Sequence, residues 1–525
     1  MLLGLFVNPI ISQANNIQVS NTRFTAFDSV NQHVKVRCTV SWDNSWRDAT
    51  NYDAAWIFVK YRENKGAWKH AILSTLVSDH VVPQGAELVC PSDGRGVFLQ
   101  KSTTAPNGSV SYDIQLHWNY ASNGVLNNSG VEVQVYALEM VYVPQAAFTL
   151  GNGNSATAYS FQMGGNSTQS YLISSESGIA VDDQAASQAV TNAGYPNTLW
   201  ASGFSGNVIA DAFDTIPATF PKGFKAFYCM KYEVTQQAYV DFLNSLTYTQ
   251  QAQRTTSAPS SVAGTGALVA NNANRNGIDI MIPGVNPSKP AVYANNLTAD
   301  GSYNQNNDGA YIACNFLSWA DMAAYLDWTA LRPMTEFEFE KACRGTLTPV
   351  GSEYAWGTTL LTSAAYSNNG GLENSGTPSE GIRAANFIDG LGNAVVSNTS
   401  SSFAGPLRVG IFAANANSNN SRILTGASFY GIMELSGNLQ ERCVTIFNRP
   451  IGRQYTGNHG DGELTSNAEA DVLAWPTADA LGIGLRGGSY ANSASAARTA
   501  SRSLINSNTP LRNSTYGGRG VRTAP

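Results

Sequence analysis

Residues 319–345 read WADMAAYLDWTALRPMTEFEFEKACRG, and this stretch predicts two short helices separated by a turn. The run 319–331 is rich in apolar and aromatic residues, which favours the first helix. Thr335 and Glu338 then have the spacing of a capping box, in which each side chain binds the backbone N–H of the other residue. Gly345 stands where a helix commonly ends. The segment therefore predicts a small helical unit.

One more helix is predicted over 233–246. Thr235 suits its N-cap, because a hydroxyl there accepts a hydrogen bond from a free backbone N–H. Apolar residues follow at i, i+3, i+4 and i+7, namely Tyr239, Phe242, Leu243 and Leu246. The rest of 137–525 is rich in glycine and asparagine, so we expect mostly loops, with 250–310 as a long exposed insertion.

Residues 15–136 form a separate, all-β region in this interpretation. HVKVRCTVSW (33–42) and VEVQVY (131–136) alternate apolar and polar residues, and turn clusters separate such runs. This spacing predicts a small immunoglobulin-like β-sandwich. Cys38 and Cys90 flank Trp56 as in an inter-sheet disulfide, although two buried free thiols fit the sequence equally well.

The composition excludes several classes of protein. Apolar residues make up 43% of the 525 residues, which is enough for a large core and rules out global disorder. Charged residues reach 13%, the net charge is −6, and Lys and Arg do not cluster, so a nucleic-acid partner is not expected. An uncharged surface rich in Asn, Ser and Thr suits an extracellular protein.

The N-terminus supports the same location. Residues 2–11 are apolar and are followed by Ser12, Gln13 and Ala14, so 1–14 is interpreted as either a signal peptide or an N-terminal strand. No stretch approaches the roughly 20 apolar residues of a transmembrane helix. We therefore predict a secreted or cell-surface protein without a membrane span.

A family resemblance emerges from the order of several motifs. The region from 139 onward resembles the formylglycine-generating enzyme, or sulfatase-modifying factor, domain, which has a divergent C-type-lectin fold. The resemblance implies an α+β domain over 137–525 behind the sandwich. Its main segments are MVYVP (140–144), FYCMKYEVT (227–235), the helical unit 319–345, YGIMELSGN (430–438) and RGGSY (486–490).

The family's oxidase chemistry is not expected here. The resemblance implies copper held by two cysteines after the GGS turn, where this chain has Asn492 and Ala497, and no cysteine follows Cys443. Copper(I) requires soft thiolate ligands. Iron-dependent relatives use imidazoles, but 137–525 contains His459 alone, which we expect in a solvated loop. We expect neither copper nor iron, and no catalytic residues.

Three glutamates of the helical unit were also considered as catalytic acids. Glu338 is expected to cap the helix, while Glu336 and Glu340 are expected to be solvated or paired with Arg344. These roles are structural.

One metal site is compatible with the sequence. The family's G-N-x-W-E-W element supplies calcium ligands, and it reads GNLQER (437–442) here. Asn438 and Glu441 keep the ligand oxygens, so a structural Ca²⁺ and a plain polar turn are equally compatible with this segment. Arg442 is the residue that would neutralise Glu441 in the second case.

The C-terminal segment is the candidate ligand face. Tyr, Arg and small polar residues are typical of recognition surfaces, and the pattern resembles the variable tail of lectin-fold binders that retroelements diversify. A structural role for the same arginines is equally open. The predicted ligand-binding residues are Tyr490, Asn492, Arg498, Arg502, Asn506, Asn508 and Tyr516.

The predicted function is therefore a secreted or surface, non-catalytic recognition protein whose partner is an extracellular protein or glycan. One alternative is a structural subunit whose N-terminal strand pairs with a neighbouring subunit. The other is a metal-dependent oxidoreductase of the same family.

Overall fold

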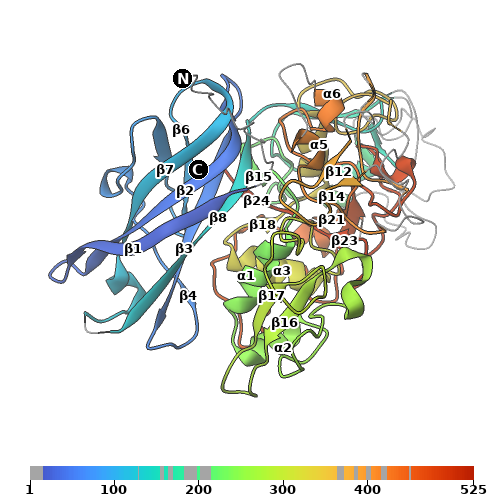
Figure 1. Cartoon of the computed structure of the whole chain (residues 1–525). Coiled ribbons are helices and arrows are strands. Elements are labelled where there is room, and N and C mark those ends of the chain that lie inside the picture. Colours follow the sequence, from blue (N-terminus) through green and yellow to red (C-terminus); the bar gives the residue numbers. More distant parts are fainter. Residues whose placement is uncertain are drawn as a thin grey trace, which may run out of the picture.

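The computed structural model combines a β-sandwich with a larger half of mixed helices and short strands, so the chain is α+β (Figure 1). Segment 1–14 lies outside the described residues. The structure describes residues 16–127, 129–153, 159–163, 169–182, 198–201, 214–362, 372–383, 388, 390–397, 404–414, 422–447 and 451–525.

The described residues of the first half form eight strands. They are β1 (Gln18–Asp28), β2 (His33–Arg47), β3 (Asp53–Glu63), β4 (Lys69–His70), β5 (Ala86–Val89), β6 (Val97–Lys101), β7 (Ala105–Trp118) and β8 (Val131–Val143).

The strands of the second half are shorter. They are β9 (Phe148–Leu150), β10 (Phe161–Met163), β11 (Tyr171–Ile173), β12 (Ile179–Asp182), β13 (Leu199–Ala201), β14 (Asp214–Ile216), β15 (Phe227–Met230), β16 (Ile278–Ile282), β17 (Val292–Asn295), β18 (Arg332–Pro333), β19 (Leu372–Glu373), β20 (Gly381–Ile382), β21 (Gln440–Val444), β22 (Ile483–Arg486), β23 (Tyr516–Gly517) and β24 (Gly520–Thr523). The α-helices are α1 (Gln236–Asn244), α2 (Tyr248–Arg254), α3 (Trp319–Trp328), α4 (Glu336–Arg344), α5 (Ile411–Ala414) and α6 (Arg422–Thr425).

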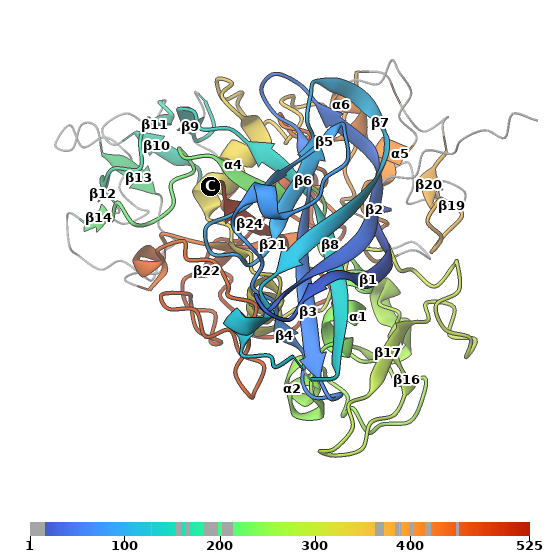
Figure 2. The same cartoon turned by 90° about the vertical axis from the view of Figure 1, so that its left-hand side faces the viewer.

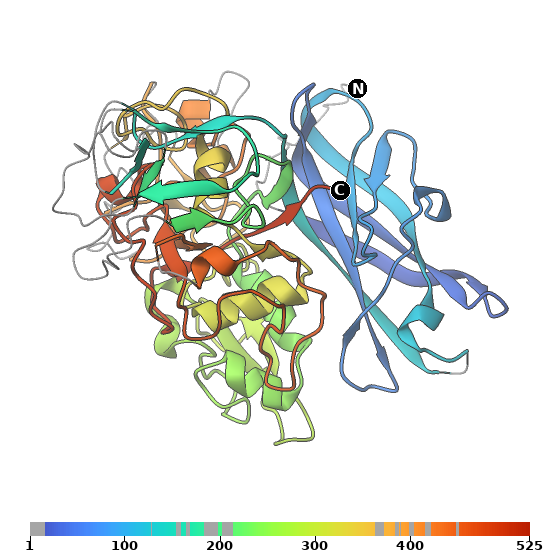
Figure 3. The same ribbon diagram turned by 180° about the vertical axis from the view of Figure 1, so that it is seen from behind.

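One long sheet joins the two halves. Its strand order is β18-β24-β15-β8-β3-β6-β5, with β4 beside β3. β8 pairs with β3 over residues 131–141 and with β15 over 140–143, so the expected boundary at 136/137 falls inside a continuous strand. The C-terminal strand β24 pairs with β15, which brings the end of the chain back to the sandwich (Figure 3).

The central strand β3 is buried on both faces. Ala55, Ile57 and Val59 face the core of the sandwich, which lies between the long sheet and the sheet β1-β2-β7. Trp56 and Phe58 alternate with them and face the second half, where Phe58 packs edge-on against Trp328 of α3. Side chains alternate across a strand, so an unbroken apolar run marks a strand covered on both sides.

This arrangement decides between the two interpretations of Cys38 and Cys90. Cys38 and Cys90 are free thiols, as are the other four cysteines. Trp56 points away from the sandwich core, and its indole N–H donates to the carbonyl of Thr329 at 2.8 Å. Trp42 and Trp118 supply the large aromatic groups that fill the sandwich core instead.

The helical unit follows the sequence prediction closely. Thr335 and Glu338 form a capping box at the start of α4, and Gly345 ends it with φ +66°. Thr235 caps α1 by accepting from the N–H of Ala238. α3 ends at Trp328, earlier than the predicted residue 331.

The segment 250–310 is not the exposed insertion that was expected. Its strands β16 and β17 form an antiparallel hairpin, and β17 packs on α1. Ile278 and Ile280 are fully buried in the main core. The β9–β14 strands gather in another part of the second half (Figure 2). Among the described residues, no helix is both long and apolar enough to span a membrane.

Candidate functional site

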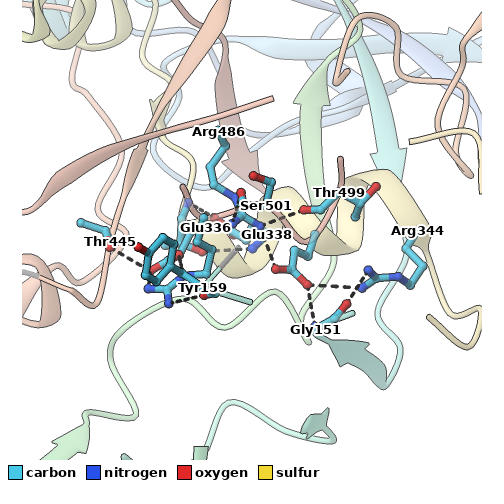
Figure 4. Close-up of polar contacts among 12 residues, drawn as sticks. Gly151, Tyr159, Glu336, Glu338, Arg344, Thr445, Arg486, Thr499 and Ser501 are labelled. Carbon is cyan, nitrogen blue, oxygen red and sulfur yellow. Dashed lines mark hydrogen bonds and ion pairs between the residues drawn. The ribbon is translucent and has the colours of Figure 1, made fainter. Parts of the chain in front are cut away.

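The side chains of α4 anchor the C-terminal segment through buried ion pairs (Figure 4). Arg502 donates to Glu336 at 2.7 Å, and Arg486 donates to Glu340 at 2.7 Å. Although burial disfavours its charged form, the arginine partners hold the pKa of Glu336 below its ordinary value. Glu336 and Glu340 are thus buried and paired, not solvated.

Further contacts extend this network. Glu340 also accepts from the backbone N–H of Gly151 at 2.8 Å and pairs with Arg344, as was predicted for that arginine. Glu338 caps α4 and forms a bidentate pair with Arg332, with N–O distances of 2.6 and 2.9 Å. Charge-assisted bonds of this geometry are strong. The acids of α4 hold the fold together.

Two predicted ligand-binding residues belong to the interior. Arg502 is 0% exposed, and its guanidinium also lies 4.1 Å over the ring of Phe161. Tyr490 is 2% exposed and packs in a cluster with Met433 and Leu439. Both side chains are thus occupied by contacts inside the fold.

The remaining predicted residues lie nearer the surface. Asn506 is exposed, whereas Asn492, Arg498, Asn508 and Tyr516 are half-buried. We call Asn492, Asn506, Asn508 and Tyr516 the tail surface. Arg498 lies beside it, and its buried Nε has no hydrogen-bond partner among the described residues.

Gln440 and Arg442 hold this surface in place, although neither was among the predicted ligand-binding residues. The Gln440 amide donates to Asn492 at 2.9 Å and accepts from the hydroxyl of Thr515 at 3.0 Å. Arg442 donates to the carbonyls of residues 509 and 511, and its guanidinium lies 4.7 Å over the ring of Tyr516. The available signal was that both residues replace the tryptophans expected from the family resemblance.

The candidate calcium ligands, Asn438 and Glu441, are bonded to other protein groups. Asn438 Oδ1 accepts from the N–H of Leu407 at 2.9 Å, and the Asn438 amide donates to Glu233. Glu441 Oε1 pairs with Arg519 at 2.6 Å, so Arg519, and not Arg442, is its cation. Burial outweighs this arginine and raises the pKa of Glu441 to about 7. Calcium requires six to eight oxygens, and these residues do not fit it.

The position of the copper pair is also filled by packing. Asn492 Oδ1 accepts from Gln440 and from the hydroxyl of Ser489, and the methyl group of Ala497 is fully buried. Burial raises the pKa of the Cys443 thiol well above its ordinary value, so it stays protonated. The residues at this position do not fit a copper(I) centre, which requires thiolates.

His459 differs from the solvated loop residue that was expected. It is half-buried, and its Nε2 accepts from the backbone N–H of Thr523 at 3.0 Å. Burial lowers its pKa well below the ordinary value, so the ring is neutral. Among the described residues, the metal-competent cluster of acids, histidines or cysteines consists of Asp327, Asp461 and Asp471, with no histidine in it.

Comparison with known proteins places the second half in a family. Residues 191–524 match the model of the sulfatase-modifying factor enzyme 1-like domain, which covers well over half of the chain. No curated protein matches the chain.

Proposed function

We propose that this chain, which belongs to the sulfatase-modifying factor family, is a secreted or surface recognition protein that uses the tail surface to bind an extracellular protein or glycan. The main support for this proposal comes from the residues that occupy the position of the family's copper-binding cysteines. Asn492 and Ala497 stand there and serve hydrogen bonding and packing. The family scaffold is retained, while its redox ligands are replaced.

The tail surface suits recognition because a rigid base carries it. Arg502 and Arg486 fasten the segment to α4, and Gln440 and Arg442 fix its middle. The small amide side chains and the tyrosine of the tail surface can then adapt to a ligand without disturbing the packing of the core. Leu511, 70% exposed beside this surface, adds an apolar contact group.

A peptide assay tests the absence of oxidase chemistry. The full chain is loaded with copper(I) and incubated with oxygen and a cysteine-containing peptide. We expect the mass spectrum of the peptide to show no conversion of cysteine to aldehyde. Copper-dependent conversion would overturn the proposal.

A second experiment tests recognition. The full chain is applied to a printed array of glycans and extracellular proteins, alongside the double variant Asn506→Ala/Asn508→Ala. The matched control, Asn306→Ala/Asn307→Ala, removes two exposed asparagines elsewhere. We expect a signal that the tail variant loses and the control keeps. Equal signals from both variants, or no signal from wild type, count against the tail surface.

A structural subunit is the second candidate, favoured by β1. This strand is at the edge of its sheet and exposes Phe24 by 39% and Phe27 by 61%. Exposed apolar edges invite pairing with another chain. Sedimentation of the wild type and of Phe27→Lys tests this candidate, because an assembly through β1 would dissociate in the variant.

A further inference from the structure

A groove lies where the sandwich meets the second half, and it is independent of the tail surface. Its volume is about 480 Å³, within the range of small-molecule sites. It is lined by residues of β1, β3 and β8 and by residues of α1 and α3. None of residues 489–516 lines it.

Two buried hydrogen-bond donors among the lining residues lack partners. The hydroxyl of Tyr325, 0% exposed, and the indole N–H of Trp328, 5% exposed, have no hydrogen-bond partner among the described residues. Buried polar groups in native proteins nearly always find partners, in protein, water or ligand. These donors call for an acceptor that enters the groove.

The same groove offers acceptors and an aromatic wall. Asp241 lines it, and the side chain of Gln237 donates to this carboxylate at 2.8 Å. Asp241 and Tyr325 both line the groove, and burial raises the pKa of Tyr325, so its hydroxyl stays protonated and can donate. Tyr136 and Trp328 form the wall, with ring centroids 4.9 Å apart.

These groups discriminate between classes of ligand. An anion would meet the carboxylate of Asp241, which lines the groove. Of the other two acids there, Glu139 is paired with Lys231, and burial raises the pKa of Glu233 well above its ordinary value. A cation could pair with Asp241 but has no acceptor for the two unpartnered donors. A neutral polyhydroxylated molecule supplies both functions, because each hydroxyl donates and accepts, and its C–H faces can lie on the aromatic rings.

We propose that this groove is a binding site for a neutral saccharide. Sugar hydroxyls accept from Tyr325 and Trp328 and donate to Asp241, and a pyranose face packs on Tyr136. The site goes beyond the proposed function and does not rest on it.

Calorimetric titration of the full chain tests the site. The probes are the neutral disaccharides cellobiose, lactose, N,N′-diacetylchitobiose and mannobiose, with tetramethylammonium as the cation and sialyllactose as the anion. We expect at least one neutral disaccharide to bind and the two charged probes to bind more weakly. Binding of none of the neutral disaccharides, or stronger binding of tetramethylammonium or sialyllactose, would overturn the proposal.

Two variants locate any binding. Tyr325→Phe removes the unpartnered hydroxyl, so we expect saccharide affinity to fall roughly threefold to tenfold while the Tm does not fall. Asp241→Asn should weaken binding similarly. The exposed Asp300→Asn is the matched control and should bind like wild type. Affinity that is unchanged in both groove variants, or lost in the control, would refute this site, whatever the tail surface does.

Discussion

Replacing Arg502 tests whether this residue anchors the C-terminal segment or contacts a ligand. Arg502→Met keeps the apolar stem but removes the cation that faces Glu336 at 2.7 Å in a site that excludes solvent. Removing one partner of a buried pair leaves an uncompensated charge and costs about 3–5 kcal/mol. Glu336 would retain hydrogen bonds from Thr445 and Ile446, at 2.9 and 3.0 Å, which favours the lower end of that range.

Urea unfolding followed by tryptophan fluorescence and by circular dichroism measures this loss. Asn506→Ala, an exposed residue of the same segment, is the control and should change the unfolding free energy by less than about 0.5 kcal/mol. Adding Glu336→Gln to Arg502→Met removes the stranded charge and should restore part of the stability. If Arg502→Met is as mild as the control, the anchoring role of Arg502 is wrong.

Three further outcomes are expected. Under denaturing, non-reducing conditions a thiol reagent should titrate all six cysteines, whereas a Cys38–Cys90 bridge would leave four. Millimolar calcium should not change the Tm, and a rise that Glu441→Gln abolishes would restore the calcium site. Burial, with Asp461 and Asp471 nearby, raises the pKa of Asp327 to about 7, so the native state keeps a proton that the unfolded state releases. The unfolding free energy should therefore fall as pH rises between about 4 and 7, by at most about 1.4 kcal/mol per pH unit from this group. The variant Asp327→Asn should lack this component. Parallel pH profiles of the wild type and the variant would contradict the prediction.

Local signals in the sequence were reliable where short-range geometry decides the structure. The capping box of Thr335 and Glu338 and the N-cap Thr235 were both predicted, because such motifs depend on residues three positions apart. The family was also evident from the order of its motifs, and the match over 191–524 confirms it.

Long-range pairing could not be predicted from the same signals. Nothing local to Arg502 indicates that Glu336, far away in the chain, is its partner. The sequence placed Trp56 between Cys38 and Cys90, but which core its side chain enters depends on the layer that packs on the outer face of β3. Gln440 and Arg442 differed visibly from the family pattern, but their partners become known only when the tail is folded back on β21.

The shared strand β8 limits how this protein can be taken apart or recombined. A fragment cut at the limits of the matched domain, 191–524, would lack β8 and β3 altogether. β15 would then end in an open edge, and the helical layer that receives Trp56 and Phe58 would be bare and prone to aggregate. Chimeras should therefore transfer the sandwich and the family domain together, since the sandwich covers one side of the second half.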